Sequence, residues 1–419
     1  MRRQREEAGR RQPEKRTGTM QFEEIRRRLL SLLENRDELS DQDILDAIDE
    51  LVLAEGRELR LSLRAKEEFR RELFCSVRKL DVIQELVDDP SVTEIMVNGY
   101  RNIFVEKSGK IRKWEKAFSS EERLWDVIQQ IAGRCNRVVN EETPILDARL
   151  ANGARVNAVL PPVSLDGPVL TIRRFPDEPI TMVKLVAWGS ITQAAADFLK
   201  KLVSSGYTIL VGGGTSTGKT TFLNVLSACI PREERIVTIE DNAELQLLGL
   251  DNVVRLEARA ANLEGGREIT IRDLLRTALR MRPSRIIIGE VRSGEAGDFL
   301  SCLNTGHSGS LGSAHANSVR DMIGRLENMV LMGMNIPIPV IRRQIVSGIE
   351  ILVHLGRDGN GKRRVEEIAE ITGLKGDEVQ IRTLFRLDGE NHLELVNPLL
   401  HGEKLEKKYE KEEKEKTGL

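Results

Sequence analysis

The sequence is poor in aromatic residues, which make up 4% of its 419 residues. Exposed aromatic rings are the surfaces on which proteins stack single-stranded nucleic acid, so the composition disfavours that class of protein. The charged residues are 31% of the chain, but their sum is a formal charge of only −2. Neither an anionic membrane nor nucleic acid is therefore indicated by composition, and we expect nucleic acid not to be the main partner.

Cysteine is also scarce, with four residues that are far apart and form no Cys-x-x-Cys pair: Cys75, Cys135, Cys229 and Cys302. This spacing offers neither a disulfide framework nor a zinc site, and it suits a reducing compartment.

No long apolar run is present. A membrane-spanning helix needs roughly 18–20 consecutive apolar residues, whereas the nearest candidate, Met329–Ile341, is shorter and contains two prolines. The first residues, Met-Arg-Arg-Gln-Arg-Glu-Glu, lack the apolar core of a secretory signal. We therefore expect a cytoplasmic protein that reaches a membrane only peripherally, through a partner.

What the chain does contain is a phosphate-binding loop. Gly213–Thr220 reads Gly-Gly-Thr-Ser-Thr-Gly-Lys-Thr, a full match to G-x-x-x-x-G-K-[ST]. A β-prone run, Tyr207–Val211, precedes it, and Thr220–Leu226 has helical spacing. Such glycines let backbone amides turn toward phosphate oxygens, and the helix adds its positive end. The alternative is a glycine-rich turn without a ligand, but the full match in this context predicts a nucleoside triphosphate, ATP.

Within the loop, the Lys219 side chain is expected to reach the β- and γ-phosphates and the Thr220 hydroxyl to bind Mg²⁺. The predicted ATP-binding residues of this segment are Gly213, Gly214, Thr215, Ser216, Thr217, Gly218, Lys219, Thr220 and Thr221.

The chain before the loop divides into three parts. Residues 1–19 are charged and nearly free of apolar groups, which predicts a disordered arm. Residues 20–90 carry apolar residues at helical spacing, which predicts a small helical bundle. The predicted stripes are Phe22, Ile25, Leu29 and Leu33, then Ile44, Ile48, Leu51 and Leu53, with a third helix over 66–80.

Residues 91–177 change to a period of two, which predicts an α+β domain. Strands are expected at 94–97, 102–106, 110–114, 154–160 and 169–175, and Ser119 with Glu122 resembles a capping box before a helix. Phe175–Pro179 has the composition of a linker.

Residues 178–400 alternate helices with short, almost fully apolar strands: Ile209–Val211, Arg235–Ile239 and Ile286–Ile288. Such strands are typical of a parallel sheet covered on both faces, so we predict an α/β fold with a RecA-like core. Asp358–Lys362 is read as a hairpin turn rather than a Ca²⁺ loop, because the acidic spacing downstream is missing. Residues 401–419 form a charged tail to which no function is assigned.

Two glutamates are the candidate catalytic groups beside Lys219. Glu290 ends the apolar strand that begins at Arg285, and the carboxyl ends of parallel strands lie beside the phosphate site. Glu290 is therefore expected to position or activate water. Gly289 stands where many such ATPases carry an aspartate for Mg²⁺, and Glu240, which follows another apolar strand, is predicted to fill that role, directly or through water. An ordinary helix start is the alternative for Glu240.

His307 and His315 lie in a segment of small residues that allows close approach of the backbone to a ligand. Their spacing is not that of metal ligands, so the alternatives are a γ-phosphate sensor and a structural role. Arg155, Arg173 and Arg174 precede the loop, and Arg173 and Arg174 alternate on a strand, so only one of the two can face a phosphate from that strand.

The order of four motifs resembles the type II/type IV secretion ATPases. These are the phosphate loop, Thr-Ile-Glu-Asp-Asn-Ala-Glu-Leu, Arg-Ile-Ile-Ile-Gly-Glu-Val-Arg and Thr-Gly-His-Ser-Gly-Ser-Leu. Upstream, Val-Thr-Glu-Ile-Met-Val-Asn-Gly and Pro-Ile-Leu-Asp-Ala-Arg-Leu-Ala-Asn-Gly-Ala-Arg-Val-Asn look like the CpaF-like branch, which serves tight-adherence (Tad/Flp) pili. The resemblance covers about residues 20–400.

This resemblance implies a hexameric ring that holds ATP between the α+β domain and the RecA-like domain. It implies pilus assembly or protein secretion through an inner-membrane platform protein. Glu240 matches the acidic-box glutamate, Glu290 the Walker B glutamate and His307 the first histidine of the His box. Arg155, Arg173 and Arg174 fall in the segments whose arginines reach the nucleotide. The chain departs from zinc-bearing relatives in lacking a four-cysteine cluster, and it has Asn242 where many members have proline.

Three other functions are compatible with the loop alone. A DNA-translocating ATPase would need a basic channel, a small-molecule kinase would need an acceptor lid, and a scaffold that binds ATP without turnover would not need Lys219, Glu240 and Glu290 together.

Overall fold

The computed structural model divides the chain into two compact units, Met1–Asp177 and Glu178–Leu419, and each is described by itself. The predicted arm of residues 1–19, residues 175–178 of the predicted linker and residues 411–419 of the predicted tail lie outside the described residues. Those described are 22, 24–33, 40–58, 62–107, 109–150, 152–174, 179–259, 267–359, 361–389, 392–408 and 410.

The first unit begins with helices that share one apolar core. Residues 24–33 are helical, and α2 (Asp41–Glu58) and α3 (Leu63–Arg78) follow. Their buried side chains include Ile25, Leu29, Ile48 and Leu73, as the helical spacing predicted. At one position the predicted stripe is wrong: Val52 is buried, whereas Leu53 is 58% exposed.

A six-stranded antiparallel sheet forms the rest of this unit, in the order β3-β2-β1-β6-β5-β4. The short η1 (Asp81–Ile83) and α4 (Gln84–Asp88) lead into it. Helix α5 (Glu121–Arg134) shares its core through Leu124 and Ile128, and its cap is Ser120 rather than the predicted Ser119. The strands are β1 (Val92–Asn98), β2 (Asn102–Lys107), β3 (Lys110–Lys113), β4 (Ile145–Arg149), β5 (Arg155–Val159) and β6 (Val169–Arg173).

The second unit is built on a nine-stranded sheet in the order β15-β14-β13-β12-β7-β11-β10-β8-β9. Neighbouring strands from β12 to β9 run parallel, and their central members are almost completely buried. The strands of this part are β7 (Ile209–Gly213), β8 (Ile236–Glu240), β9 (Val253–Glu257), β10 (Arg285–Val291), β11 (Leu311–His315) and β12 (Ile351–Arg357).

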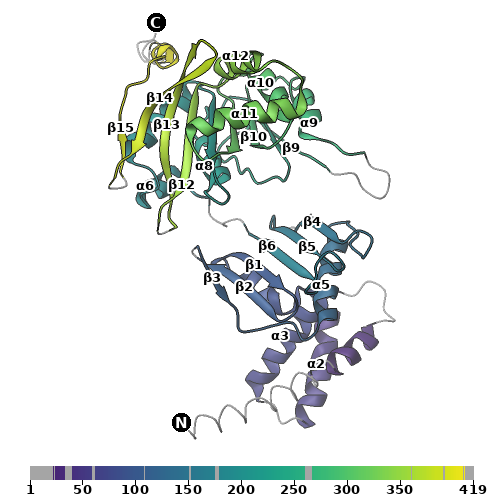
Figure 1. Ribbon diagram of the computed structural model, residues 1–419. Coiled ribbons are helices and arrows are strands. Elements are labelled where there is room, and N and C mark those ends of the chain that lie inside the picture. Colours follow the sequence, from purple (N-terminus) through teal and green to yellow (C-terminus); the bar gives the residue numbers. More distant parts are fainter. Residues whose placement is uncertain are drawn as a thin grey trace. The chain divides into compact units, whose positions relative to one another are not determined.

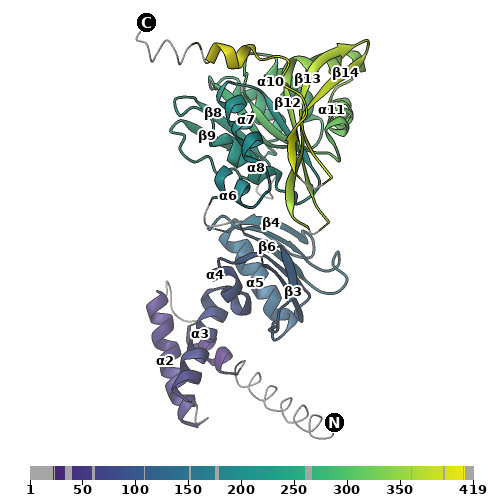
Figure 2. The same cartoon turned by 90° about the vertical axis from the view of Figure 1, so that its left-hand side faces the viewer.

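Helices cover both faces of this sheet. Along β7, Ile209 and Val211 belong to one apolar core and Leu210 to the other, so side chains alternate between two buried layers. Figure 1 shows α9 (Ile271–Ala278), α10 (Glu295–Leu303), α11 (Val319–Gly333) and α12 (Ile338–Gly348) on one side. Figure 2 shows α6 (Met182–Ala187), α7 (Gln193–Ser204) and α8 (Lys219–Ser227) on the other.

An antiparallel extension continues the sheet beyond β12 and was not predicted. It consists of β13 (Arg363–Lys375), β14 (Glu378–Leu387) and β15 (Leu393–Leu395). The turn between β12 and β13 is the hairpin that the sequence predicted at Asp358–Lys362, closed by a 2.9 Å hydrogen bond from the Asp358 amide to the Lys362 carbonyl.

The segment that follows the predicted boundary at residue 400 packs on the second unit. The Lys404 ammonium donates to the Glu350 carboxylate at 2.7 Å and to the Gly206 carbonyl at 2.8 Å. The buried Glu370 carboxylate accepts from the backbone amides of Leu400 and His401, both at 2.8 Å. Over the part of the chain described, no helix is both long and apolar enough to cross a membrane.

Candidate active site

The phosphate loop joins β7 to α8 with the geometry that its glycines allow. Gly218 has a φ of +95° and is the N-cap of α8, whose first residue is Lys219. A Cβ atom on Gly213 would lie 2.6 Å from the Leu355 carbonyl oxygen and 2.6 Å from Thr217 Oγ1, so only glycine fits there. Thr217 Oγ1 in turn donates to the Gly214 carbonyl at 2.9 Å, which braces the turn.

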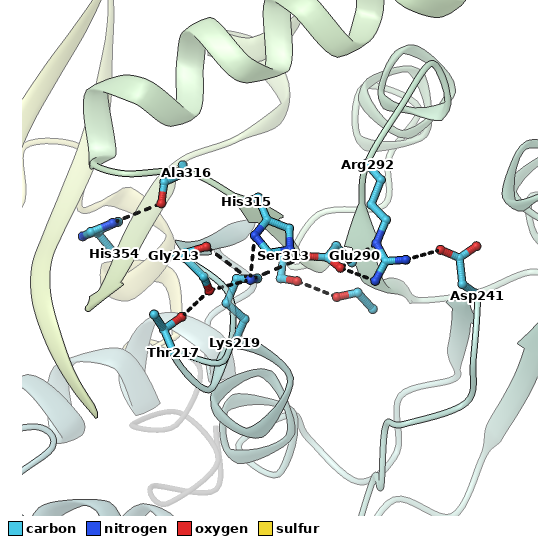
Figure 3. Close-up of polar contacts among 12 residues, drawn as sticks. Gly213, Thr217, Lys219, Asp241, Glu290, Arg292, Ser313, His315, Ala316 and His354 are labelled. Atoms are coloured by element: carbon cyan, nitrogen blue, oxygen red, sulfur yellow. Dashed lines mark hydrogen bonds and ion pairs between the residues drawn. The ribbon is translucent and has the colours of Figure 1, made fainter. Parts of the chain in front are cut away.

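The Lys219 ammonium lies inside this turn. Its Nζ donates to the carbonyls of Gly213 and Gly214 at 3.2 and 3.0 Å, and only 8% of the residue is exposed. It also lies 3.6 Å from Glu290 Oε1 and 3.4 Å from His315 Nδ1 (Figure 3). A cation is thus held at the loop by neutral carbonyls and one carboxylate.

Glu290 stands at the carboxyl end of β10, beside the loop as predicted. Its Oε1 is buried and accepts no hydrogen bond from the described residues, although the Lys219 and His315 nitrogens lie near it. Its Oε2 accepts from the Arg292 guanidinium at 2.6 Å, and Arg292 bridges to Asp241 at 3.3 Å (Figure 3). One carboxylate oxygen is fixed, and the other faces the loop.

His315 is the histidine that the structure brings to the loop. It ends β11, which pairs with β7 so that His315 is opposite Gly213. Burial lowers the His315 pKa, and the positive charge of Lys219 adds to this, against the carboxylate of Glu290. Because an ammonium can only donate, Nδ1 must accept from Lys219, which leaves the ring proton on Nε2, 2.9 Å from Glu290 Oε1.

His307 is not at the loop. It precedes β11 and lies at the opposite end of that strand, where its Nδ1 contacts the Cys302 carbonyl at 3.1 Å. β11 covers roughly 13 Å from Leu311 to His315, at about 3.3 Å per residue, and His307 precedes the start of that strand. Within this chain the structure thus brings His315, and not His307, to the phosphate loop. A role for His307 at the nucleotide stays a prediction.

Glu240 ends β8, next to β10 in the sheet, and is 2% exposed. Burial raises its pKa to about 7, against two hydrogen bonds of 2.9 Å from the amides of Glu244 and Leu245 to Oε1. A buried carboxyl group whose pKa is raised in this way is typical of a functional site.

Gly289 explains how Glu240 fits. A Cβ atom on Gly289 would lie 2.9 Å from Glu240 Cγ and 3.3 Å from Glu240 Oε1. The residue that replaces the usual aspartate therefore provides the space that the Glu240 side chain occupies.

The remaining loop residues differ in exposure. Thr215 and Ser216 are exposed at the tip, whereas Thr220 and Thr221 are half-buried in the first turn of α8. Among the described residues no group of three or more His, Cys, Asp or Glu side chains could hold a metal ion by itself. Metal binding by Thr220 and Glu240 stays a prediction.

The three upstream arginines belong to the first unit. Arg155 and Arg173 are directly opposite each other on β5 and β6, so their side chains share one face of the sheet. Arg174 points to the other face and donates to the Asp89 carbonyl. The contact of these arginines with the loop stays a prediction.

Two functional candidates escaped the sequence analysis altogether. Arg357 and Arg363, from the ends of β12 and β13, both donate to the Ser216 carbonyl at the tip of the loop. Over 140 residues separate them from Ser216, so no local pattern could have linked them.

Comparison with known proteins gives the family. A family model described as type II/IV secretion system protein matches residues 77–365. A Mycobacterium tuberculosis protein named for conjugal transfer is 34% identical over 324 residues, which are 76% of this chain and 91% of that protein. The type IV secretion system protein PtlH of Bordetella pertussis is 33% identical over 328 residues, 70% of this chain and 95% of PtlH.

Among solved structures, the pilus retraction motor PilT with bound ADP matches with a TM-score of 0.50 over 79% of this chain and 87% of PilT. Their sequences are 18% identical there, so this likeness concerns the fold alone. Together with the family match, the relatives show that the chain belongs to the type II/IV secretion system protein family, the wider group that its motifs resemble.

Proposed function

We propose that this protein is a cytoplasmic, hexameric motor ATPase that powers assembly of Tad/Flp-type pili or protein secretion through an inner-membrane platform protein. The family supports a secretion motor, and the upstream motifs support the CpaF-like branch. ATP hydrolysis in the RecA-like second unit would supply the work.

The observation that carries the proposal is the cluster of Lys219, Glu290 and His315 beneath the glycine loop. Transfer of a γ-phosphoryl group to water needs positive charge near the phosphate and a group that orients the water. Lys219 provides the charge, and the inward Oε1 of Glu290 provides an acceptor for a proton of the water. The neutral His315 ring can donate from Nε2 to whichever oxygen lies there.

The site also fits Mg²⁺. The Thr220 hydroxyl lies in the first turn of α8. The Glu240 carboxylate accepts from two backbone amides and has no positively charged partner among its described contacts. Mg²⁺ would neutralise phosphate charge, and Thr220 would hold it directly and Glu240 through water. A nearby cation would also favour ionised Glu240, against the burial that raises its pKa.

The ring and the domain movement rest on the family resemblance and on the paired arginines. Arg155 and Arg173 are opposite each other on β5 and β6, so both guanidinium groups can approach one phosphate group from the same face. We propose that one of them, or Arg174, reaches ATP from the first unit. Hydrolysis would then change how the two units are held and so move the platform.

Lys219→Ala tests the assignment of the loop. We expect ATP binding and hydrolysis by the purified chain to be lost, measured by nucleotide titration and phosphate release. Undiminished hydrolysis in that variant would exclude the loop as the active site. Electron micrographs with and without an ATP analogue test the ring, and co-purification with a polytopic inner-membrane protein tests the partner.

A DNA-translocating ATPase is the second candidate, favoured by the conjugal-transfer names of relatives such as TrbB of Rhizobium radiobacter. A mobility shift with DNA at physiological salt that disappears at high salt would support it. If DNA mobility does not shift under those conditions, the secretion motor is the remaining candidate.

A further inference from the structure

The tip of the phosphate loop is held from outside by two arginines. The Arg357 guanidinium donates to the Ser216 carbonyl oxygen at 2.7 Å from Nη2 and 3.2 Å from Nε. Arg363 Nε donates to the same oxygen at 3.0 Å, and its Cδ lies 3.5 Å from where a Cβ on Gly218 would be. Two cations from another part of the sheet thus converge on one peptide group of the loop.

The strand order brings them there. β12 runs parallel to β7, with Leu355 opposite Gly213, so Arg357 extends past the strand end that carries the loop. Arg363 is directly opposite Arg357 on β13. The turn that joins them is closed by Asp358, whose carboxylate accepts from the Lys362 amide at 2.8 Å and from Arg364 at 3.0 Å.

This arrangement exceeds what the carbonyl needs. A carbonyl oxygen has two lone pairs, yet three N–H groups are directed at it. Like charges directly opposite each other on paired strands are also unfavourable. Two guanidinium groups placed together at a loop tip therefore indicate a purpose other than satisfying one acceptor.

The peptide plane shows what the contact does. In a trans peptide the carbonyl of one residue and the N–H of the next point in opposite directions. Fixing the direction of the Ser216 carbonyl therefore also fixes the Thr217 N–H, which points the opposite way within the peptide plane. Ser216 has a φ of +58°, a left-handed conformation that is costly for a residue other than glycine, so this orientation has to be enforced.

We propose that Arg357 and Arg363 are positioning residues for the triphosphate: they fix the Ser216–Thr217 peptide so that its N–H faces the phosphates. This inference rests on the proposed function, since it concerns the same loop. Charge near the carbonyl also polarises the peptide, which makes its N–H a stronger donor to an anion.

The test compares Arg357→Ala, Arg363→Ala and the double variant with the wild type, using titration with ATP and steady-state hydrolysis. We expect the double variant to bind ATP about tenfold more weakly or worse, as for the loss of charge-assisted hydrogen bonds. KM should rise by a similar factor, while kcat changes by less than about threefold. Arg386→Ala is the matched control, because that exposed arginine donates to Glu367 on β13 and Thr383 on β14.

Ser216→Gly separates positioning from direct contact with phosphate. Glycine adopts a positive φ without cost, so the loop would depend less on the arginines, and their removal should weaken ATP binding less in this background. An equal loss in both backgrounds would contradict positioning. This cycle also guards against a variant that merely folds poorly, since a folding defect would appear in melting curves of both backgrounds.

The outcomes distinguish this inference from the proposed function. If the double variant binds ATP as tightly as the wild type while Lys219→Ala does not bind, the inference is overturned and the ATPase stands. If the wild type itself binds no ATP, both the inference and the proposed function are wrong. A loss of ATP affinity in Arg386→Ala equal to that in the double variant would also overturn it.

Discussion

The two edges of the sheet in the second unit use the same kinds of charged residue in opposite ways. At the amino ends of the strands, Arg285 is 2% exposed and pairs with both Glu234 oxygens at 2.6 Å, and it donates to the Val203 carbonyl at 2.6 Å. At the carboxyl ends, Glu290 has one oxygen with no hydrogen bond from the described residues. The Arg285 guanidinium makes hydrogen bonds through all three of its nitrogens, whereas one oxygen of Glu290 makes none to the residues that the structure describes.

The difference shows which charged groups still lack a hydrogen bond in the described part of the folded chain. Buried charges that have all their partners hold strands and loops in register, whereas a buried charge without them costs stability and persists where a ligand completes it. At the carboxyl ends, Glu290 has one oxygen without a hydrogen bond from the described residues, and burial raises the pKa of Glu240 to about 7. Substitutions at the two edges should therefore separate activity from stability.

The largest effect is expected for Glu290→Gln. The amide keeps the size of the side chain but cannot take a proton from water, so hydrolysis should fall by roughly a thousandfold while ATP binding persists. Phosphate release and nucleotide titration measure the two. Near-wild-type turnover would move the catalytic role to Glu240. Glu234→Gln is the control at the other edge, where turnover per folded molecule should be unchanged.

Arg285→Ala should lower the stability of the fold and leave turnover per folded molecule unchanged. Removing the arginine leaves Glu234 and two carbonyls without their partner, so the free energy of unfolding should drop by about 3–5 kcal/mol, as for other broken buried pairs. Urea unfolding measures it. Arg292→Ala at the carboxyl edge is the comparison, since Arg292 is 51% exposed and should cost less than about 1 kcal/mol. Equal losses would remove the contrast between the edges.

The pH dependence of stability tests Glu240. Its pKa is about 7 in the folded chain, against 4.5 as the ordinary value, so the folded state binds the proton more tightly. The stabilisation is complete below pH 4.5 and is lost as the pH rises to about 7, by about 3 kcal/mol at most. The difference between wild type and Glu240→Gln in unfolding experiments across this range should show that slope. Parallel curves would mean that Glu240 ionises as it does in water.

The smallest effect is expected at the amino ends of the strands, for Lys404→Ala. The Lys404 ammonium is partly exposed and has alternative solvation in water, so its hydrogen bonds to Glu350 and Gly206 should contribute about 1 kcal/mol. A shift of the melting temperature with unchanged ATP hydrolysis would fit this estimate. A large loss of activity would show that the segment after residue 400 acts on the loop.

The sequence predicted the parts of the site that depend on neighbouring residues. A strand, glycines and a helix in succession define the phosphate loop, and Glu240 and Glu290 each follow an apolar run, so their places at strand ends could be expected. The helical spacing of residues 20–90 likewise predicted the core of the first helices, except that Val52 is buried in place of Leu53.

What could not be predicted depends on strand order. That β12 lies beside β7, and so brings Arg357 to Ser216, follows from the packing of the whole sheet rather than from any local pattern. The choice between His307 and His315 also required the direction of β11, since His307 precedes that strand and His315 is its last residue. The strands beyond β12 carry charged residues between apolar ones and gave no parallel-sheet signal.

The contact between Gly289 and Glu240 has a consequence for the evolution of the two positions. An aspartate at position 289 would need the space that the Glu240 side chain fills, with a Cβ 2.9 Å from Glu240 Cγ. An aspartate at position 289 would therefore displace the Glu240 side chain from the place it now occupies. We expect residues 240 and 289 to be inherited as a pair, each making the other tolerable.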